Sequence, residues 1–249
     1  MYKIPANLGF TYNYIHYLPS CHSTNEVATN LLTNGVEEGT VVITDNQTNG
    51  RGQRGNYWES EPFLNLTFSL ILKPDFLPVQ SQFQLTQIIS ISIAEIIQGL
   101  VSKTVKVKWP NDIYVGDKKI GGILIQNTVK GKVIENSIIG IGLNVNQTSF
   151  ETANATSILS LTQRMTDLNQ VLIDVLKSIA ANYQRLKNGE RKAIGVEYHN
   201  LLLGLREVRN FKSENEFLGK IIGVDPMGRL LIDNGSSVRS FQNQEVKFI

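Results

Sequence analysis

The chain has 249 residues, enough for one large domain or for a domain of roughly 200 residues with a small second module. Hydrophobic residues make up 41% of the chain and charged residues 18%, a composition that excludes a disordered or a fibrous protein. The formal net charge of +2 is too small to indicate a nucleic-acid or membrane partner by itself. The single cysteine excludes an intramolecular disulfide and a cysteine-rich zinc site.

The start of the chain has neither the apolar core nor the cleavage pattern of a secretory signal. The apolar runs are strand-sized or interrupted by polar residues, and so fall short of the roughly 20 residues of a membrane-spanning helix. A lone cysteine also fits a reducing compartment. We therefore expect a cytoplasmic protein without a membrane partner.

A strand and a helix are predicted at the beginning of the chain. Residues 13–18 alternate aromatic and polar side chains, the period of two that is typical of a strand. Ser23 followed by Glu26 matches a capping box, which predicts a helix from there to about Leu32. Gly35 is placed where such a helix would end.

Two strands, a loop and a long helix are predicted next. Residues 40–44 form a short apolar run that indicates a buried strand, whereas residues 45–57 are polar, rich in glycine and without periodicity, as in a loop. Residues 65–72 are strand-like again. Between Phe83 and Leu100, apolar residues recur at helical spacing, so we expect this helix to cover a sheet.

The following region is predicted to be a β-meander and then helical. Turn signals at residues 116–117 and 130–131 separate segments of β-type pattern, which lie at residues 105–109, 113–115, 120–126 and 133–145. Helical spacing returns at residues 168–186, and a further helix is expected near residues 194–203.

The character of the chain changes after Gly204, which suggests a second domain. Short strands separated by turn signals are predicted at residues 217–224, 229–233, 238–241 and 246–249, a density that suggests a small barrel. The fold class is therefore α+β. We expect residues 1–203 to form a mixed β-sheet backed by helices and residues 204–249 to form a small C-terminal β-barrel.

The densest chemical signal is the sequence NGRGQRGNYW at residues 49–58. Glycines at positions 50, 52 and 55 alternate with Arg51 and Arg54 in a loop that follows a strand. Glycine permits close approach of the backbone to a ligand, and arginine supplies forked donors for phosphate or carboxylate. The pattern indicates an anion-binding loop, although a solvated flexible loop has the same composition.

The same glycines match G-x-G-x-x-G, the dinucleotide-binding fingerprint, but its structural context is missing. That motif must open a helix whose N-terminus receives a pyrophosphate. Here Tyr57, Trp58 and Pro62 lead into another strand instead. We reject a nicotinamide site, and the sequence contains no phosphate-binding G-x-x-x-x-G-K-[ST] motif.

Three further segments combine polar residues or glycines with strands. KWPND at residues 108–112 ends a buried strand, KIGGIL at 119–124 begins one, and GIGLNVN at 140–146 pairs glycine with asparagine within one. Asn111 and Asp112 are candidate site residues or an ordinary turn, and Lys119 is a cleft cation or a surface lysine. The third segment is a ligand-facing strand or a bulged core strand.

Taken together, these segments resemble the biotin protein ligase family, with four motifs in family order. The family's S-T-N matches residues 23–25, its Q-x-x-G-R-G loop residues 47–52, its K-W-P-N-D residues 108–112 and its K-[IL]-[AG]-G-I-L residues 119–124. The resemblance covers nearly the whole chain. It implies a class II synthetase-like catalytic domain with an SH3-like C-terminal barrel, of the monofunctional type without an N-terminal DNA-binding domain, since Ser23 lies near the start.

The family pattern implies roles for individual residues. The catalytic residues are Arg51, Lys119 and Asp112. The predicted biotin contacts are Ser23, Thr24, Asn25, Gln47, Gly50, Arg51, Gly52, Lys119, Gly121 and Gly122, and the predicted nucleotide contacts are Arg54, Trp58, Asn111 and Asn144. Many relatives have arginine where this chain has Gln53, so the role of that arginine in retaining the adenylate does not carry over to this chain, and whether Arg54 substitutes for it stays open.

The implied activity is ATP-dependent activation of biotin and its transfer to a lysine of a biotin carboxyl carrier protein. Mg²⁺ is the expected cofactor, with unassigned ligands, because both substrates are anionic. Arg51 and Lys119 would offset negative charge, and Asp112 would accept the proton of the acceptor lysine. Residues 50–57 would close over the reactive adenylate. A homodimer is compatible with the resemblance, and DNA binding is not expected.

There are two alternatives, a related enzyme and a protein of a different class. A lipoate ligase shares the fold and the adenylation chemistry, but the G-R-G loop together with K-W-P-N-D favours biotin. A non-catalytic module that recruits protein or RNA through its barrel would leave Arg51 and Lys119 without a chemical role.

Overall fold

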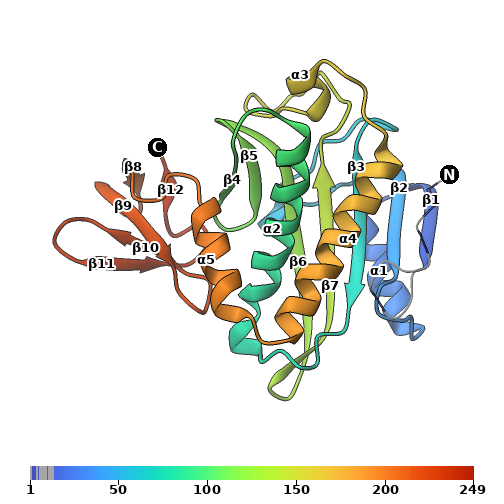
Figure 1. The fold of residues 1–249 in the computed structure, drawn as a ribbon, viewed down its shortest axis with the longest axis horizontal. Helices are drawn as coiled ribbons and strands as arrows, with labels where there is room; N and C mark the ends of the chain where they lie inside the picture. Colours follow the sequence, from blue (N-terminus) through green and yellow to red (C-terminus); the bar gives the residue numbers. More distant parts are fainter. Residues whose placement is uncertain (1, 4, 6–9, 11–13) are drawn as a thin grey trace.

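The computed structural model describes residues 2, 3, 5, 10 and 14–249, except for the side chain of Arg54. Its main feature is a seven-stranded sheet in the order β1-β2-β3-β7-β6-β5-β4 (Figure 1). The strands are β1 (Ile15–Cys21), β2 (Val41–Gln47), β3 (Leu66–Leu72), β4 (Val105–Lys108), β5 (Asp112–Val115), β6 (Lys118–Lys130) and β7 (Val133–Leu143).

The sheet is mixed because β1 and β2 are parallel and the other neighbours are antiparallel. A parallel pair needs a crossover, which α1 (Thr24–Thr33) supplies. The strands β4 to β7 form the predicted meander, and the turns at Gly116 and Gly131 adopt positive φ angles of 62° and 63°. The prediction of a mixed sheet backed by helices is confirmed.

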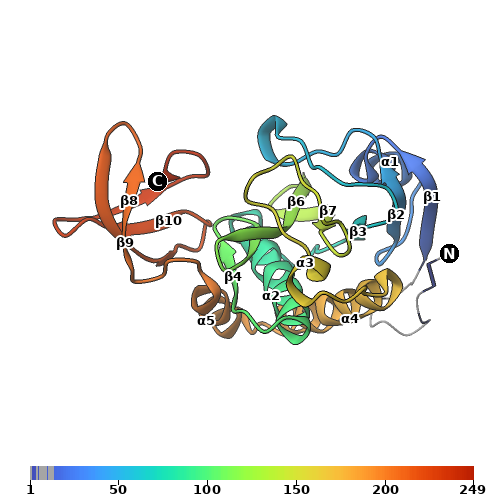
Figure 2. The ribbon, with the colours of Figure 1, turned by 90° about the horizontal axis from the view of Figure 1, so that it is seen from above.

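Helices cover the two faces of the sheet unequally. The long helices α2 (Phe83–Leu100) and α4 (Leu168–Lys187), together with α5 (Arg191–Leu201), lie on one face, and α1 lies on the other (Figure 2). Alternate residues of a strand point to opposite faces of the sheet. Val41 and Ile43 belong to the main core, whereas Val42 packs beneath α1 on the other face. The short helix α3 (Ile158–Thr162) follows β7 after an irregular segment.

The α2 region is more apolar than we predicted from the lengths of the apolar runs. Residues Val79–Leu100, including the 3₁₀ turn Val79–Ser81, span 22 residues and contain an 18-residue window with a mean hydropathy of 1.2, enough by length and composition to cross a membrane. In the fold, 61% of this apolar window is buried. Its side chains pack against α4, α5 and the strands of the meander, so its hydrophobicity serves the core.

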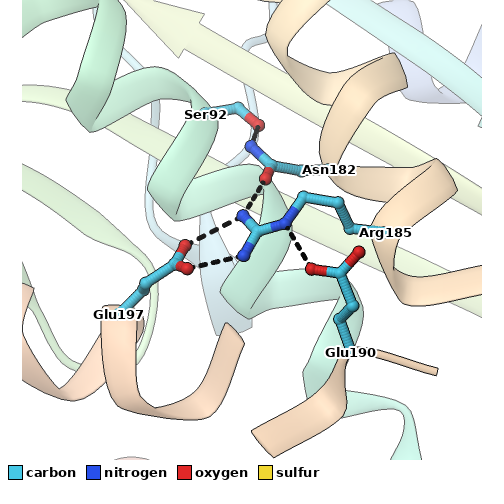
Figure 3. Close-up of polar contacts among 5 residues, drawn as sticks. All are labelled: Ser92, Asn182, Arg185, Glu190 and Glu197. Atoms are coloured by element: carbon cyan, nitrogen blue, oxygen red, sulfur yellow. Dashed lines mark hydrogen bonds and ion pairs between the residues drawn. The ribbon is translucent and has the colours of Figure 1, made fainter. Parts of the chain in front are cut away.

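A charged cluster joins the three helices of this layer (Figure 3). Arg185 of α4 donates to both oxygens of Glu197 of α5, at 2.5 and 2.9 Å, and to Glu190 at 3.0 Å. It also donates to Asn182, whose amide donates to Ser92 of α2 at 2.9 Å. Each charged group therefore has partners, and the bidentate geometry fixes α5 against α4.

The C-terminal part is a five-stranded antiparallel sheet in the order β11-β10-β9-β8-β12. Its strands are β8 (Val208–Lys212), β9 (Glu216–Val224), β10 (Leu230–Asp233), β11 (Val238–Phe241) and β12 (Lys247–Phe248). The arrangement is consistent with the barrel-like domain we expected, although β11 and β12 are end strands that do not pair with each other. It projects from the β4 side of the main sheet (Figures 1 and 2).

Several predicted boundaries were wrong in detail. The strand predicted at residues 40–44 continues to Gln47, and the one predicted at 133–145 ends at Leu143. The capping box does not form, since Ser23 occupies the N-cap position of α1 without a side-chain hydrogen bond and Glu26 pairs with Arg51 instead. Residue 13, at the start of the first predicted strand, lies outside the described residues.

Candidate active site

A cavity of about 240 Å³ opens where several predicted motifs meet. The start of α1, the loop after β2 and the turn between β4 and β5 form its walls, and β6 and β7 contribute its floor. Asn243 and Gln244, in the turn between β11 and β12 of the C-terminal part, also line it. The cavity therefore gathers residues from most of the length of the chain.

A buried network of neutral polar groups forms one end of the cavity. The Oε1 atom of Gln47 accepts hydrogen bonds from the Thr24 backbone N–H at 2.9 Å and from its hydroxyl at 3.3 Å. Ser69 Oγ lies 2.8 Å from Thr24 Oγ1 and 2.6 Å from Asn25 Oδ1, and Asn25 donates to Gln126 at 3.0 Å. These fixed donors and acceptors can recognise an uncharged polar ligand group.

Glycines let the neighbouring side chains approach the sheet. A Cβ atom on Gly140 would collide with Asn25, and one on Gly142 would collide with the ring of Trp58. At Gly50 a Cβ atom would lie 2.5 Å from the Trp58 carbonyl oxygen and 2.8 Å from Gln47 Nε2. Larger residues at these positions would displace the groups that shape the cavity.

The arginine- and glycine-rich loop folds into a compact hairpin beside the cavity. Trp58 N–H donates to Gly50 O at 3.0 Å, and Gly52 N–H donates to Asn56 O at 2.7 Å around a 3₁₀ turn at Gln53–Gly55. The Trp58 ring extends from this hairpin over Gly142, and its Nε1 is buried without a hydrogen-bond partner. An orphaned donor of this kind inside a cavity is available to a ligand.

Two ion pairs hold the charged groups of the site. Lys119 Nζ lies 2.7 Å from Asp112 Oδ1 and 5.6 Å from the centre of the Trp58 ring. Arg51 pairs with Glu26, and this pair is more open to solvent. The exposed fractions of the Arg51 and Glu26 side chains are 54% and 42%, whereas those of Lys119 and Asp112 are 29% and 28%. An anionic ligand could replace either carboxylate as the partner of its cation.

The turn between β4 and β5 is stabilised by Asn111. Its side-chain amide donates to Ile123 O at 2.5 Å, and the N–H of Ile123 donates to Asn111 O at 3.1 Å. Nearby, burial and then the charge of Asp112 raise the pKa of Tyr114 to about 12, so this phenol stays protonated. Asn111 thus positions Asp112 relative to β6, in addition to lining the cavity.

The comparisons with known proteins agree with this geometry. The model of the Biotin/lipoate A/B protein ligase family matches residues 17–144, about half of the chain. The chain belongs to this family. It is 30% identical over 231 residues to the bifunctional ligase/repressor BirA of Bacillus spizizenii, an alignment that covers 90% of this chain and 71% of that protein.

Two other relatives show that the likeness extends beyond the matched domain. Biotin--[acetyl-CoA-carboxylase] ligase of Mycobacterium tuberculosis is 27% identical over 203 residues, covering 80% of this chain and 74% of that protein. Biotin protein ligase from Aquifex aeolicus in complex with biotin and ATP superimposes with a TM-score of 0.80 at 28% identity, covering 96% of this chain and 99% of that one. The structural similarity to this family member thus includes the C-terminal sheet.

The fold of this ligase-family member brings most predicted site residues together. Those that line the cavity are Ser23, Thr24, Asn25, Gln47, Arg51, Gly52, Trp58, Asn111, Asp112, Lys119 and Gly122. Gly50 lies behind the wall against Trp58 and Gln47, and Gly121 faces Leu143 and Ile113 rather than the cavity. Asn144 is outside the lining, and its buried Oδ1 has no partner. The side chain of Arg54 lies outside the described residues.

Several lining residues were not among the predicted site residues. Thr67 of β3 lines the cavity, and its signal was polarity within a strand of otherwise buried apolar residues. Asn243 donates to the side chain of Gln53, so the turn between β11 and β12 contacts the hairpin directly. No local pattern in the sequence signals that contact, because it depends on how the two sheets pack.

The described residues contain no group of three or more His, Cys, Asp or Glu side chains placed to hold a metal ion. Mg²⁺ in nucleotide-binding proteins is commonly held by one or two carboxylates together with substrate phosphates. Asp112 is the carboxylate that lines the cavity and fits this arrangement.

Proposed function

We propose that this chain is a biotin–protein ligase, which activates biotin with ATP to biotinyl-5′-AMP and transfers the biotinyl group to a lysine of a biotin carboxyl carrier domain. The observation that carries the proposal is the cavity, which combines a neutral polar network with the Lys119–Asp112 pair. The family membership and the relatives named as biotin ligases favour biotin over lipoate as the acid.

Biotin presents an uncharged ureido group at one end and a carboxylate at the other. The network of Thr24, Gln47 and Asn25 offers fixed, buried polar atoms that suit the ureido group. Ser23, at the start of α1, is a further contact in the proposal. Lys119 and Arg51 are the cations available to the carboxylate.

In the first half-reaction, a carboxylate oxygen of biotin attacks the α-phosphorus of ATP. The bond from that phosphorus to the bridging oxygen breaks, and pyrophosphate leaves. Lys119 offsets the negative charge that builds between the two groups, and its contact with Asp112 fixes the position of its ammonium. Bound Mg²⁺ would neutralise phosphate charge and would be held largely by the phosphates themselves.

In the second half-reaction, the amine of the acceptor lysine attacks the acyl carbon and AMP leaves. The nucleophile must lose a proton, and Asp112 is the proposed acceptor. The carboxylate is held by Lys119 at one oxygen, Oδ1, in the structure.

The nucleotide part of the site is proposed to include Trp58, Arg54, Asn111 and Asn144. Trp58 supports this role through its ring, which lies in the cavity with an unpartnered Nε1, and Asn144 through its unpartnered Oδ1. Both atoms are buried polar groups that a ligand could satisfy.

The hairpin of residues 50–57 is proposed as a lid over the adenylate. A mixed anhydride is destroyed by water, so exclusion of solvent protects it. We expect the amides of this hairpin to exchange more slowly with deuterium when biotinyl-adenylate is bound. Equal protection in the free and bound protein would contradict a lid.

The remaining parts of the proposal concern partners and organisation. The acceptor is a folded carrier domain, the location is cytoplasmic, and a homodimer is compatible with the family. Residues 1–203 and 204–249 are proposed as the two domains, and the expectation of no sequence-specific DNA binding remains a prediction. A gel shift at physiological salt with biotin present tests the last point.

One assay tests the substrate and the reaction together. The purified protein is incubated with ATP, Mg²⁺ and either biotin or lipoate, and the products are identified by mass spectrometry. Biotinyl-5′-AMP without lipoyl-AMP is the expected result. Lipoyl-AMP as the main product would favour the lipoate ligase alternative, and the absence of any adenylate would favour a non-catalytic module.

A further inference from the structure

Glu59, the residue that follows Trp58, accepts hydrogen bonds from an irregular segment between β7 and α3. Its Oε1 accepts from the backbone N–H of Glu151 at 2.8 Å and from the Gln147 amide at 3.4 Å. Its Oε2 accepts from the backbone N–H and the hydroxyl of Thr152, both at 3.2 Å. Both carboxylate oxygens are therefore engaged with residues far away in the sequence.

The far end of that segment is attached to Lys119. The N–H of Lys119 donates to Asn154 O at 2.7 Å, and the N–H of Thr156 donates to Lys119 O at 2.9 Å. The side chain of Asn144 donates to Thr156 O at 3.1 Å. The segment thus joins Glu59 at its beginning to the backbone of Lys119 at its end.

On its other side, Glu59 is adjacent to the Trp58 backbone, which is fixed by the hydrogen bond to Gly50. The Trp58 ring and the Lys119 ammonium face each other in the cavity at 5.6 Å. One carboxylate therefore connects the chain that carries Trp58 to the segment that is attached to Lys119. None of its hydrogen bonds goes to Thr24, Asn25 or Gln47, at the other end of the cavity.

A carboxylate suits this position because its donors come from two directions. Glutamine would keep one acceptor oxygen but would turn an NH₂ group towards backbone N–H donors, so part of the contact would become repulsive. Hydrogen bonds to an ionised acceptor are also stronger than neutral ones. Residues 147–157 form no helix or strand, apart from the isolated bridge between Ala155 and Lys119, so the middle of the segment depends on side-chain contacts such as those of Glu59.

We infer that Glu59 is a positioning residue, which holds residues 147–156 against the Trp58 chain and so sets Trp58 and Lys119 relative to each other, where the biotin carboxylate and the nucleotide would meet. The inference deepens the proposed function and rests on it. It predicts that loss of Glu59 weakens the use of ATP far more than the affinity for biotin, because the polar network for the ureido group is separate and Arg51 is a second cation for the biotin carboxylate.

The test compares Glu59→Gln with Glu61→Gln in the full chain. Glu61 lies two residues away, is exposed, and contributes a backbone N–H rather than its carboxylate to the contact with Gln147. Biotin affinity is measured by calorimetry, and kcat and KM for ATP are measured in adenylate formation. For Glu59→Gln we expect KM for ATP to rise about tenfold, with biotin affinity within about twofold of the unsubstituted protein.

Hydrogen exchange gives a second readout that needs no activity. The amides of residues 147–157 should exchange at least about tenfold faster in Glu59→Gln than in Glu61→Gln. Thr152→Val, which removes one donor from the other side of the contact, should show a smaller change in the same direction. The melting temperature separates this local effect from global destabilisation.

Equal KM for ATP and equal exchange in the two glutamine variants would overturn the inference. A parallel loss of biotin affinity, ATP use and melting temperature in Glu59→Gln would also overturn it, by assigning Glu59 to general stability. If the unsubstituted protein forms no adenylate, the proposed function fails, whereas the exchange result still decides whether Glu59 holds the segment.

Discussion

The helical layer and the cavity each contain a dense polar cluster, but the two clusters differ in how completely their groups are partnered. In the helical layer, every nitrogen of the Arg185 guanidinium donates to a neighbouring oxygen. In the cavity, Lys119 pairs with one carboxylate and Trp58 Nε1 is buried without a partner. A fully satisfied cluster joins helices, whereas an incompletely satisfied one leaves groups for a ligand.

This difference predicts opposite consequences of substitution in the two clusters. Changes in the cavity should remove activity and leave stability nearly intact. Changes in the helical cluster should lower stability and leave the chemistry nearly intact.

The largest effect is expected at Asp112. If its carboxylate accepts the proton of the acceptor lysine, Asp112→Asn should slow the transfer of preformed biotinyl-adenylate by about 10² to 10⁴, so that adenylate accumulates. Single-turnover kinetics measures the two steps separately, with the exposed turn residue Asp117→Asn as the control. Slow adenylate formation followed by transfer at the normal rate would instead assign Asp112 to holding Lys119 and the turn.

Lys119→Ala should have the next largest effect, on the first step. Loss of one preorganised charge typically costs about 10² to 10³ in rate, so adenylate formation should slow by that factor. Lys118→Ala is the matched control, because the neighbouring side chain is exposed at the start of β6. A similar loss in both variants, or an unchanged rate for Lys119→Ala, would argue against the assignment.

Arg185→Met should show the reverse behaviour. Removing the guanidinium leaves Glu190, Glu197 and Asn182 without their shared donor, and the partial exposure of the cluster limits the cost to about 1–2 kcal/mol. The melting temperature should fall by several degrees while kcat changes by less than about twofold. Lys177→Met, an exposed position about two turns earlier on α4, is the control, and an equal drop in its melting temperature would contradict the role of the cluster.

The smallest effect concerns pH. Hydrogen bonds from Arg185, opposed in part by burial, lower the pKa of Glu197 below its ordinary value. A carboxylate with a lowered folded-state pKa stabilises the fold above the ordinary glutamate value of about 4.3 and loses this contribution as the pH falls through its folded-state value. The stability difference between the unsubstituted protein and Arg185→Met should therefore narrow on acidification below that value. A difference that stays constant from pH 7 to pH 3 would show that the ion pair contributes nothing.

Much of the fold could be predicted from the sequence because its signals are local. The helical spacing from Phe83 to Leu100 matches both ends of α2, and the turn signals at Gly116 and Gly131 separate the strands of the meander. The strand β8 was missed, since its buried pattern alternates with polar residues over a short length. Its pairing with β9 stabilises this strand, and the sequence of the strand alone does not predict that pairing.

The candidate site could be predicted only where a motif is continuous in the sequence. The prediction of a capping box at Ser23 and Glu26 was wrong, because Glu26 pairs with Arg51 of a loop about 25 residues away. The contributions of Glu59 and Asn243 depend on approaches between distant segments, at Thr152 and Gln53 respectively. Such contacts form only when distant segments pack together, so no local sequence pattern predicts them.

The buried helix α2 has a consequence for how the protein is made. Its apolar side chains emerge from the ribosome well before α4, which begins at Leu168 and covers part of their surface. Synthesis at about 5–20 residues per second leaves that surface without its cover for roughly 3 to 14 seconds. The nascent chain therefore exposes an apolar segment during translation, when chaperone binding and aggregation compete. Slower translation between residues 100 and 168 would lengthen the time for which this segment is exposed.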